Sequence, residues 1–345
     1  MHLHKIKSLL CVLQALFLME TLSFDIINLI WMFSDTTKGF LSFLSTTAEL
    51  DTFKPKIIFN KHYATYKKGY NKTIRYFPNI HFALTVKEPK TLYNIPENIK
   101  ELTIDFVAHK RISHIPEGII SIKFLYATPI FEHFLPTTLR KLQLPRFFNA
   151  HLGKDILPFG LEHLKFGSRF NVPLYPGDIP ETVTYLDLGW NYNCPLFPSS
   201  IPQSVKTLKF SKMFDQPLYP GEIPFGVEIL KLGRNFNQII NMHVLPLMLK
   251  EIYFSEEFNQ VLLPGTLPIG LTFIKFGKYY NAIIFEGVIP PTVKKIIFGD
   301  YYNQPLLKGS IPEGVEWIEF GENFSQKYKK VLPSTIQHVY VPREL

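Results

Sequence analysis

Apolar residues recur along most of the chain with a period of 22 residues, and prolines mark the phase. When each such proline is taken as position 0, the spacing is 22 residues eight times in succession and then 21. A fixed period of this length is typical of a protein built from repeated structural units. The prolines in phase are Pro136, Pro158, Pro180, Pro202, Pro224, Pro246, Pro268, Pro290, Pro312 and Pro333, and Pro96 and Pro116 precede them at intervals of 20.

Three columns of the repeat are apolar in every unit, at positions 3, 6 and 8 after the proline. In the unit that starts at Pro180 these residues are Val183, Leu186 and Leu188. The alternation of positions 6 and 8 predicts a short strand with one buried face. One unit has too little apolar surface to form a core, so the units are expected to stack. The fold class is therefore a repeat solenoid with a stacked parallel sheet on one face.

An aromatic residue at position 12 and an Asn at position 13 follow the predicted strand in nearly every unit. We expect the aromatic ring to fill the core at the far side of the sheet. The Asn is expected to bond nearby backbone groups that the turning chain leaves unpaired. Because this kind of residue recurs in nearly every unit, a structural role is favoured over a row of ligands for sugars or ions. The expected ladder is Asn149, Asn171, Asn193, Asp215, Asn237, Asn259, Asn281 and Asn303.

The unit resembles the FNIP repeat, a leucine-rich-repeat-like motif of about 22 residues that is named for its Phe-Asn and Ile-Pro pairs. The family is abundant in social amoebae and in the giant viruses that infect amoebae. The segment FNVPLYPGDIPETVTYLDLG, residues 170–189, contains a Phe-Asn and an Ile-Pro pair. The resemblance extends over residues 96–341 and implies a leucine-rich-repeat-like β-solenoid of about eleven coils. Its Asn stands two positions later than in a standard leucine-rich repeat, which implies a different convex side.

Residues 20–60 have another pattern, with apolar residues at the spacing of short helices, and predict a small helical module before the solenoid. The segment ETLSFDIINLIWMFSD resembles a diverged F-box, a module that binds the Skp adaptor of cullin–RING ubiquitin ligases. Ser23 replaces the Pro of that family, and the Asp-Leu pair expected after the first helix is absent. The alternative is a helical cap for the end of the solenoid. The residues that match the F-box are Leu22, Asp25, Ile26, Ile27, Ile30 and Phe33.

The remaining segments are an apolar extension over residues 1–19, a connector and solenoid cap over 61–95, and a tail over 342–345. The extension contains SLLCVLQALFL, which has the length of a signal-peptide core and is too short for a membrane span. Three alternatives are open for it: a signal peptide, an amphipathic or buried helix, and an upstream extension of a chain whose working start is Met19.

Charge and cysteine content narrow the expected partners and compartment. The net charge is +8, but residues 1–95 hold 12 Lys and Arg against 6 Asp and Glu and so contribute +6 of it. The rest of the chain is near neutral, which favours protein partners over nucleic acid or a membrane. Cys11 and Cys194 predict neither a disulfide framework nor a metal site. This favours an intracellular, reducing compartment. We expect the cytoplasm, or the host cytoplasm for a viral chain, with secretion as the alternative.

The repeats predict no catalytic site and no cofactor, because they contain no Gly-rich phosphate loop, paired metal-spaced His or nucleophile elbow. Function is instead expected at positions 5 and 7, which point to the solvent side of the strand. Aromatic residues beside charges on a rigid concave sheet favour protein recognition over a merely soluble face. The expected partner-binding residues are His163, Lys165, Tyr185, Asp187, Lys209, Lys231, Glu251, Tyr253, Phe273, Lys275, Trp317 and Glu319.

The leading hypothesis is a non-catalytic substrate receptor. In it, the N-terminal helices bind a Skp-type adaptor and the solenoid binds the target protein. The alternative is a plain interaction scaffold whose N-terminal helices act only as a cap. A secreted or surface protein is the third possibility, and an enzyme is the hypothesis with the least support in the sequence.

Overall fold

The computed structural model divides the chain into two compact units, Met1–Ala83 and Leu84–Leu345. In the first unit, β1 (Ala64–Thr65) pairs in parallel with the start of β2 (Phe82–Val86). The expected extension of residues 1–19 and the expected helical module of residues 20–60 lie outside the described residues. The described residues are 64–65, 82–95, 99–106, 113–126, 128 and 130–342.

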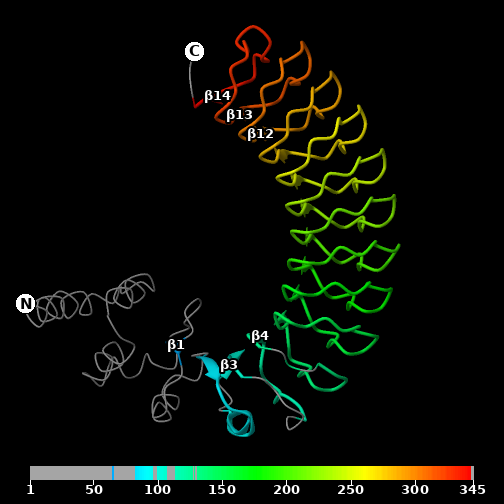
Figure 1. Ribbon diagram of the computed structural model, residues 1–345, viewed down its shortest axis with the longest axis vertical. Coiled ribbons are helices and arrows are strands. Elements are labelled where there is room, and N and C mark those ends of the chain that lie inside the picture. Colours follow the sequence, from blue (N-terminus) through cyan, green and yellow to red (C-terminus); the bar gives the residue numbers. More distant parts are fainter. Residues whose placement is uncertain are drawn as a thin grey trace, which may run out of the picture. The chain divides into compact units, whose positions relative to one another are not determined.

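The second unit is a solenoid with one short strand in each coil, and its coils stack in an arc (Figure 1). The strand order follows the chain order, and the strands from β3 to β14 pair in parallel. The predicted β-solenoid with a parallel sheet on one face is therefore confirmed. A 3-10 helix, η2 (Pro89–Asn94), lies between β2 and the strands of the repeats. These strands are β3 (Ile99–Ile104), β4 (Ser121–Phe124), β5 (Lys141–Gln143), β6 (His163–Lys165), β7 (Tyr185–Asp187), β8 (Thr207–Lys209), β9 (Ile229–Lys231), β10 (Glu251–Tyr253), β11 (Phe273–Lys275), β12 (Lys295–Ile297), β13 (Trp317–Glu319) and β14 (His338–Tyr340).

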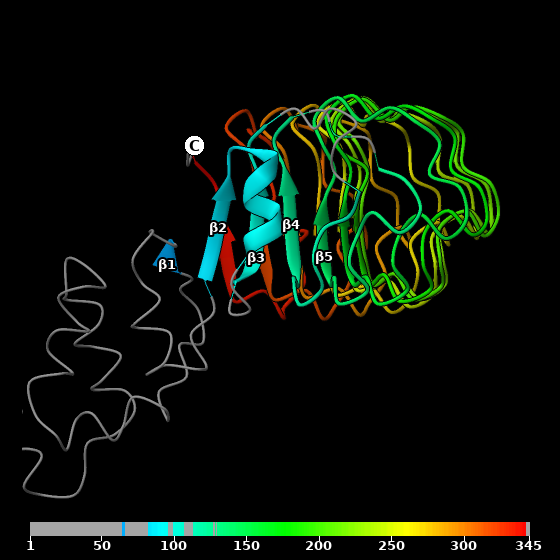
Figure 2. The same cartoon turned by 90° about the horizontal axis from the view of Figure 1, so that it is seen from below.

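Each strand pairs with the next at the same position of the repeat. Leu186 of β7, for example, pairs with Leu164 of β6 and with Leu208 of β8. A slip of one residue would turn the position-6 side chain from the core to solvent, so the column of apolar residues fixes the register. Equivalent positions of the coils therefore lie above one another, as the view along the solenoid shows (Figure 2).

The core consists of columns of side chains that continue from coil to coil. Position 6 is fully buried in every coil from Leu164 to Ile318. The aromatic rings at position 12 stack on one another, with ring centroids of Phe214 and Phe236 6.1 Å apart and nearly parallel. Burial of one large apolar side chain contributes about 1.5–3 kcal/mol. Because each ring is covered by its neighbours, no coil has a complete core of its own.

The expected Asn ladder joins neighbouring coils by hydrogen bonds. Oδ1 of Asn149 accepts a hydrogen bond from the backbone N–H of Asn171 at 2.8 Å, and Asn171 accepts from Asn193 in the same way. The acceptor thus reaches the next coil rather than its own turn, because stacking brings equivalent turns together. The series continues through Asp215, Asn237, Asn259, Asn281 and Asn303 to the N–H of Ser325.

A second recurring feature is the backbone conformation three residues before the proline. Gly177 has φ 95° there, and several other coils also have Gly at this position. Asp155 (φ 67°) and His243 (φ 66°) adopt the same left-handed conformation with a side chain present. Glycine is favoured in this region because it has no Cβ to meet the following carbonyl oxygen. The turn geometry of the repeat is therefore kept even where the sequence does not supply glycine.

Candidate partner-binding face

The sheet lines the concave side of the arc (Figure 1), and positions 5 and 7 of its strands face away from the buried column at position 6. We call this surface the concave face and define it by positions 5 and 7 of strands β4 to β13. All twelve residues expected from the sequence to bind a partner lie on these strands. The concave face consists of Ser121, Lys123, Lys141, Gln143, His163, Lys165, Tyr185, Asp187, Thr207, Lys209, Ile229, Lys231, Glu251, Tyr253, Phe273, Lys275, Lys295, Ile297, Trp317 and Glu319.

Aromatic rings and charged groups contact one another in the later part of this face. The Lys231 ammonium lies 4.6 Å from the centre of the Tyr253 ring, and that ring packs against Phe273 at 5.2 Å. The Tyr253 hydroxyl donates a hydrogen bond to the carboxylate of Glu251 at 2.9 Å. Further along, the Lys295 ammonium lies 4.4 Å from the Trp317 ring. These contacts hold the rings in place while leaving them half-buried or exposed, as in protein-binding surfaces.

Asp187 differs from the expectation of an accessible contact, because only 2% of its side chain is exposed. Its carboxylate lies 2.9 Å from the Lys209 ammonium and 4.0 Å from the Lys165 ammonium. It also accepts a hydrogen bond from the backbone N–H of Gly189 at 2.9 Å. Cations from both neighbouring coils and the following turn therefore cover this carboxylate. Asp187 fixes lysines on the concave face rather than offering a charge to a partner.

His163 lies at the start of β6 and stacks on Tyr185 of the next coil, with ring centroids 5.5 Å apart. Partial burial lowers the pKa of His163 below its ordinary value, the nearby Lys141 ammonium lowers it further, and Glu162 opposes both. The imidazole is therefore neutral at pH 7 in the free protein. It can donate or accept a hydrogen bond without adding a charge to this part of the face.

Exposed aromatic residues also occur in the turns that follow the strands, which the sequence analysis did not single out. The Phe147 ring lies 4.9 Å from the Arg169 guanidinium and 5.4 Å from that of Arg146. The Trp190 ring lies 3.7 Å from the Lys212 ammonium. These residues share a pattern in the sequence. An aromatic residue stands at position 10 or 11 of one unit, and a cation stands at position 10 or 11 of that unit or of the next one. These residues extend the candidate site beyond the strands.

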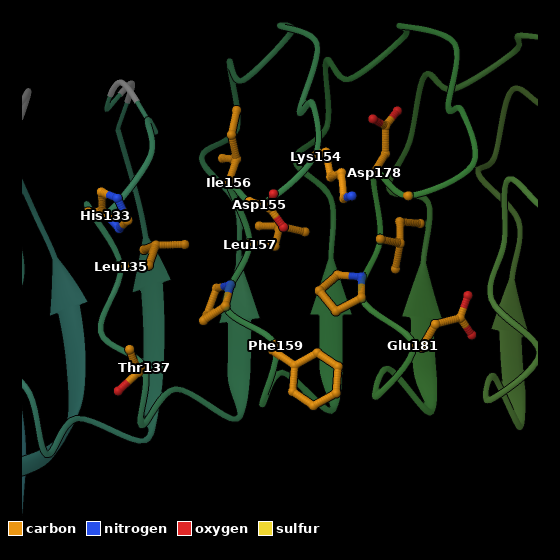
Figure 3. Close-up of a pocket in the computed structure, with 14 residues that line it drawn as sticks. His133, Leu135, Thr137, Lys154, Asp155, Ile156, Leu157, Phe159, Asp178 and Glu181 are labelled. Atoms are coloured by element: carbon orange, nitrogen blue, oxygen red, sulfur yellow. The ribbon is translucent and has the colours of Figure 1, made fainter.

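One pocket of about 350 Å³ lies on the turns before the strands and is lined by three successive coils (Figure 3). Its wall includes the apolar Leu135 and Leu157 and the carboxylates of Asp155, Asp178 and Glu181. These three carboxylates do not converge on one point, as Figure 3 shows. The backbone N–H of Tyr175 already donates to Asp178 at 2.8 Å. The pocket is a consequence of coil packing rather than a prepared ligand site.

The described part of the chain holds no group of three or more His, Cys, Asp or Glu that could bind a metal ion. Within the same residues, no helix is long and apolar enough to cross a membrane. The F-box-like residues expected to bind an adaptor, Leu22 to Phe33, lie outside the described residues.

One short parallel strand per coil, a shared apolar core and an Asn ladder at the turn define a leucine-rich-repeat-like solenoid. This class fits the coil length and the concave sheet. The chain belongs to the FNIP repeat family, whose repeat matches it in five overlapping or adjoining segments. These segments are residues 148–189, 170–213, 214–257, 258–301 and 302–341.

Several solved structures match the chain, and two of them are compared with it. One is CroV588, described as "a novel circular LRR protein structure", which is similar over 75% of this chain with 30% sequence identity and a TM-score of 0.68. This chain spans only 38% of the length of that protein. The other, YopM from Yersinia enterocolitica, is similar over 75% of this chain and 71% of its own, with 15% identity and a TM-score of 0.32. Comparison with curated proteins gave no match.

Proposed function

We propose that this chain is a non-catalytic interaction scaffold that holds a protein partner on its concave face. The observation that carries the proposal is the set of half-buried or exposed rings, Tyr253, Phe273 and Trp317, held beside lysines on one rigid sheet. Aromatic residues fixed in this way provide large contact areas at a low cost in conformational entropy. Positions 5 and 7 vary from coil to coil above constant buried columns, so they can encode specificity without altering the fold.

A finer form of the proposal is a substrate receptor of the F-box type. The N-terminal segment would bind a Skp-type adaptor of a cullin ubiquitin ligase, and the concave face would bind the target. Ubiquitin transfer would then require no catalytic residue of this chain. The support is the match of Leu22, Asp25, Ile26, Ile27, Ile30 and Phe33 to the F-box pattern. The plain scaffold, with this segment as a cap, is the alternative form.

The experiment compares two variants, in each of which three aromatic residues are changed to alanine. One changes Tyr253, Phe273 and Trp317 on the concave face, and the control changes Tyr175, Phe197 and Tyr219 in the turns before the prolines, which are also exposed. Partners are crosslinked in cells that express the natural protein and are identified by mass spectrometry. We expect the first variant to lose the main partner and the control to retain it. The proposal is contradicted if both variants retain the main partner, or if only the control variant loses it.

The same experiment separates the two forms of the proposal when a purified Skp-type adaptor is added. Changing Ile26, Ile27 and Ile30 to Asp should abolish adaptor binding and leave partner binding on the concave face intact. If this variant is folded, as judged by circular dichroism, and still binds the adaptor as before, the F-box form is wrong. If the unaltered chain does not bind the adaptor but does bind a partner, only the plain scaffold remains.

A further inference from the structure

Several cations of the solenoid have a carboxylate neighbour at the same position of an adjacent coil. Glu228, for example, lies between Lys206 at 3.5 Å and Lys250 at 2.6 Å. In the same way, Arg234 pairs with Glu256 at 3.0 Å, and Lys294 with Glu316 at 2.9 Å. Stacked coils place equivalent side chains side by side, so like charges would repel unless the sign changes from coil to coil. In these coils, the sequence supplies that change.

Five further exposed cations occur on or beside β4, β5 and β6, and four of them have no such pair among the described residues. Lys123, Lys141 and Lys165 lie on the concave face, and Arg146 and Arg169 lie in the turns that follow β5 and β6. We call these five residues the basic cluster. Among the described residues, only Lys165 of the cluster has an ion pair, at 4.0 Å from the buried Asp187, whose nearer partner is Lys209.

Two carboxylates near the basic cluster in the sequence have partners outside it. Glu162 lies 3.6 Å from Arg140, which is not part of the cluster. The carboxylate of Glu117 accepts hydrogen bonds from Thr137 and Thr138. Positive charge therefore accumulates on one rigid surface, where it costs free energy through repulsion in the free protein. Binding of an anionic partner would relieve that repulsion.

The two arginines of the basic cluster are held in a defined arrangement. The backbone N–H of Arg169 donates to the carbonyl oxygen of Arg146 at 2.9 Å, which sets the distance between the two main chains. Both guanidinium groups lie near the ring of Phe147, which is 45% exposed. A guanidinium held at a ring keeps N–H donors available for carboxylate oxygens. This arrangement resembles a prepared acceptor for paired acidic side chains.

We propose that the basic cluster binds an acidic, extended peptide segment of the partner protein, an inference that rests on the function proposed above. Carboxylates of such a segment would reach Lys123, Lys141 and Lys165 across three neighbouring strands and the two arginines at the edge. From there, the concave face continues into Tyr185, Thr207 and Ile229, which suit the apolar and polar residues of a peptide. In the register of the sheet, Lys123 and Lys165 lie in line at position 7 with Gln143 between them, and Lys141 lies in line with Tyr185 at position 5 with His163 between them.

An acidic peptide fits the basic cluster better than a single-stranded nucleic acid. Nucleic-acid sites of that kind combine cations with free aromatic faces on which bases stack. Here the Phe147 ring is occupied by two guanidinium groups, and the Tyr185 ring stacks on His163. The rings near the cluster therefore already have partners, whereas Lys123 and Lys141 have no ion pair among the described residues.

The test measures the affinity of the full chain for two fluorescein-labelled probes of equal length, a 20-residue oligoglutamate peptide and a 20-nucleotide oligothymidylate. One variant carries Lys123→Glu, Lys141→Glu and Arg146→Glu. The control carries Lys308→Glu, Lys327→Glu and Lys330→Glu, exposed lysines far along the chain, and has the same net charge. Fluorescence anisotropy gives both affinities, and circular dichroism confirms folding. A milder variant with Gln at the three cluster positions replaces the first if charge reversal disrupts the fold.

We expect the cluster variant to weaken oligoglutamate binding by about tenfold or more, and the control by less than about twofold. Equal weakening by the two variants would show non-specific attraction and overturn the proposal. Tighter binding of oligothymidylate than of oligoglutamate, lost in the cluster variant, would assign the site to nucleic acid instead. If the cluster variant still binds oligoglutamate but the variant at Tyr253, Phe273 and Trp317 no longer binds the natural partner, this inference fails and the proposed function stands. If instead the cluster variant loses the oligoglutamate and the variant at Tyr253, Phe273 and Trp317 keeps the natural partner, the basic cluster binds acidic peptides but the proposed role of the three rings is rejected.

Discussion

At the scale of single residues, the repeat depends on a left-handed backbone conformation before each proline. Gly177 adopts it at φ 95° with nothing within 4 Å of the place where a Cβ would stand. His243 adopts it at φ 66° in another coil, with its side chain exposed. The left-handed region costs a residue with a Cβ about 1–2 kcal/mol. The coil at His243 therefore carries a local strain that the coil at Gly177 does not.

We predict that replacing Gly177 with alanine and replacing His243 with glycine have opposite effects on the free energy of unfolding. Gly177→Ala should lower the free energy of unfolding by about 1 kcal/mol, because the strain outweighs the reduced entropy of the unfolded chain. His243→Gly should raise it by up to about 1 kcal/mol, since relief of strain is partly offset by the greater entropy of unfolded glycine. Urea unfolding followed by circular dichroism measures both values. Changes of the same sign in both variants would contradict this account.

At the scale of the coil, the strand and its buried columns were predictable from the sequence, and the partner of each Asn was not. Position 6 and position 8 are buried wherever stacking repeats, so a count of apolar columns is sufficient to find them. The Oδ1 of Asn237, in contrast, meets the N–H of Asn259, 22 residues further along the chain. Its partner is set by the contact between two coils, which no pattern within one coil reveals.

The Asn ladder allows a test with a matched control at one position. Asn237→Ala removes the acceptor for the Asn259 N–H at 2.9 Å and for the Gln260 amide at 3.1 Å. We expect it to lower the free energy of unfolding by about 1–2 kcal/mol, because a backbone donor loses its partner. Asn237→Asp should change it by less than about 0.5 kcal/mol. The reason is that Asp215 performs the same role one coil earlier.

Thermal and urea unfolding of the two variants measure these changes in the free energy of unfolding. If Asn237→Asp destabilises the protein as much as Asn237→Ala does, the acceptor oxygen is not the group that matters at this position.

At the scale of the whole solenoid, the sequence located the concave face but not the charge pattern on it. Fixed register makes every residue at positions 5 and 7 share one surface, so membership could be predicted. The burial of Asp187 could not, because lysines of both adjacent coils produce it. The group of Arg146, Phe147 and Arg169 was missed because it lies beyond the strands, where the sequence gives no simple periodicity of exposure.

Stacking also implies that the effect of a core substitution depends on how many neighbours cover it. Ile252 is 0% exposed in β10, whereas Val339, at the equivalent position of β14, is 39% exposed. We predict that Ile252→Ala lowers the free energy of unfolding by about 2–5 kcal/mol, and Val339→Ala by less than about 1 kcal/mol. Urea unfolding of the full chain gives both values. Similar losses at the two positions would show that neighbouring coils do not contribute as the structure indicates.

The pairing of every strand at the same position has a consequence for how such a protein can change over generations. A duplication or deletion of one 22-residue unit in the coding sequence creates a junction like those already present, since Leu186 meets Leu208 as Leu164 meets Leu186. No new loop or cap is needed at the join. The reach of the concave face can therefore grow or shrink in steps of one coil, while point substitutions at positions 5 and 7 alter what each step recognises.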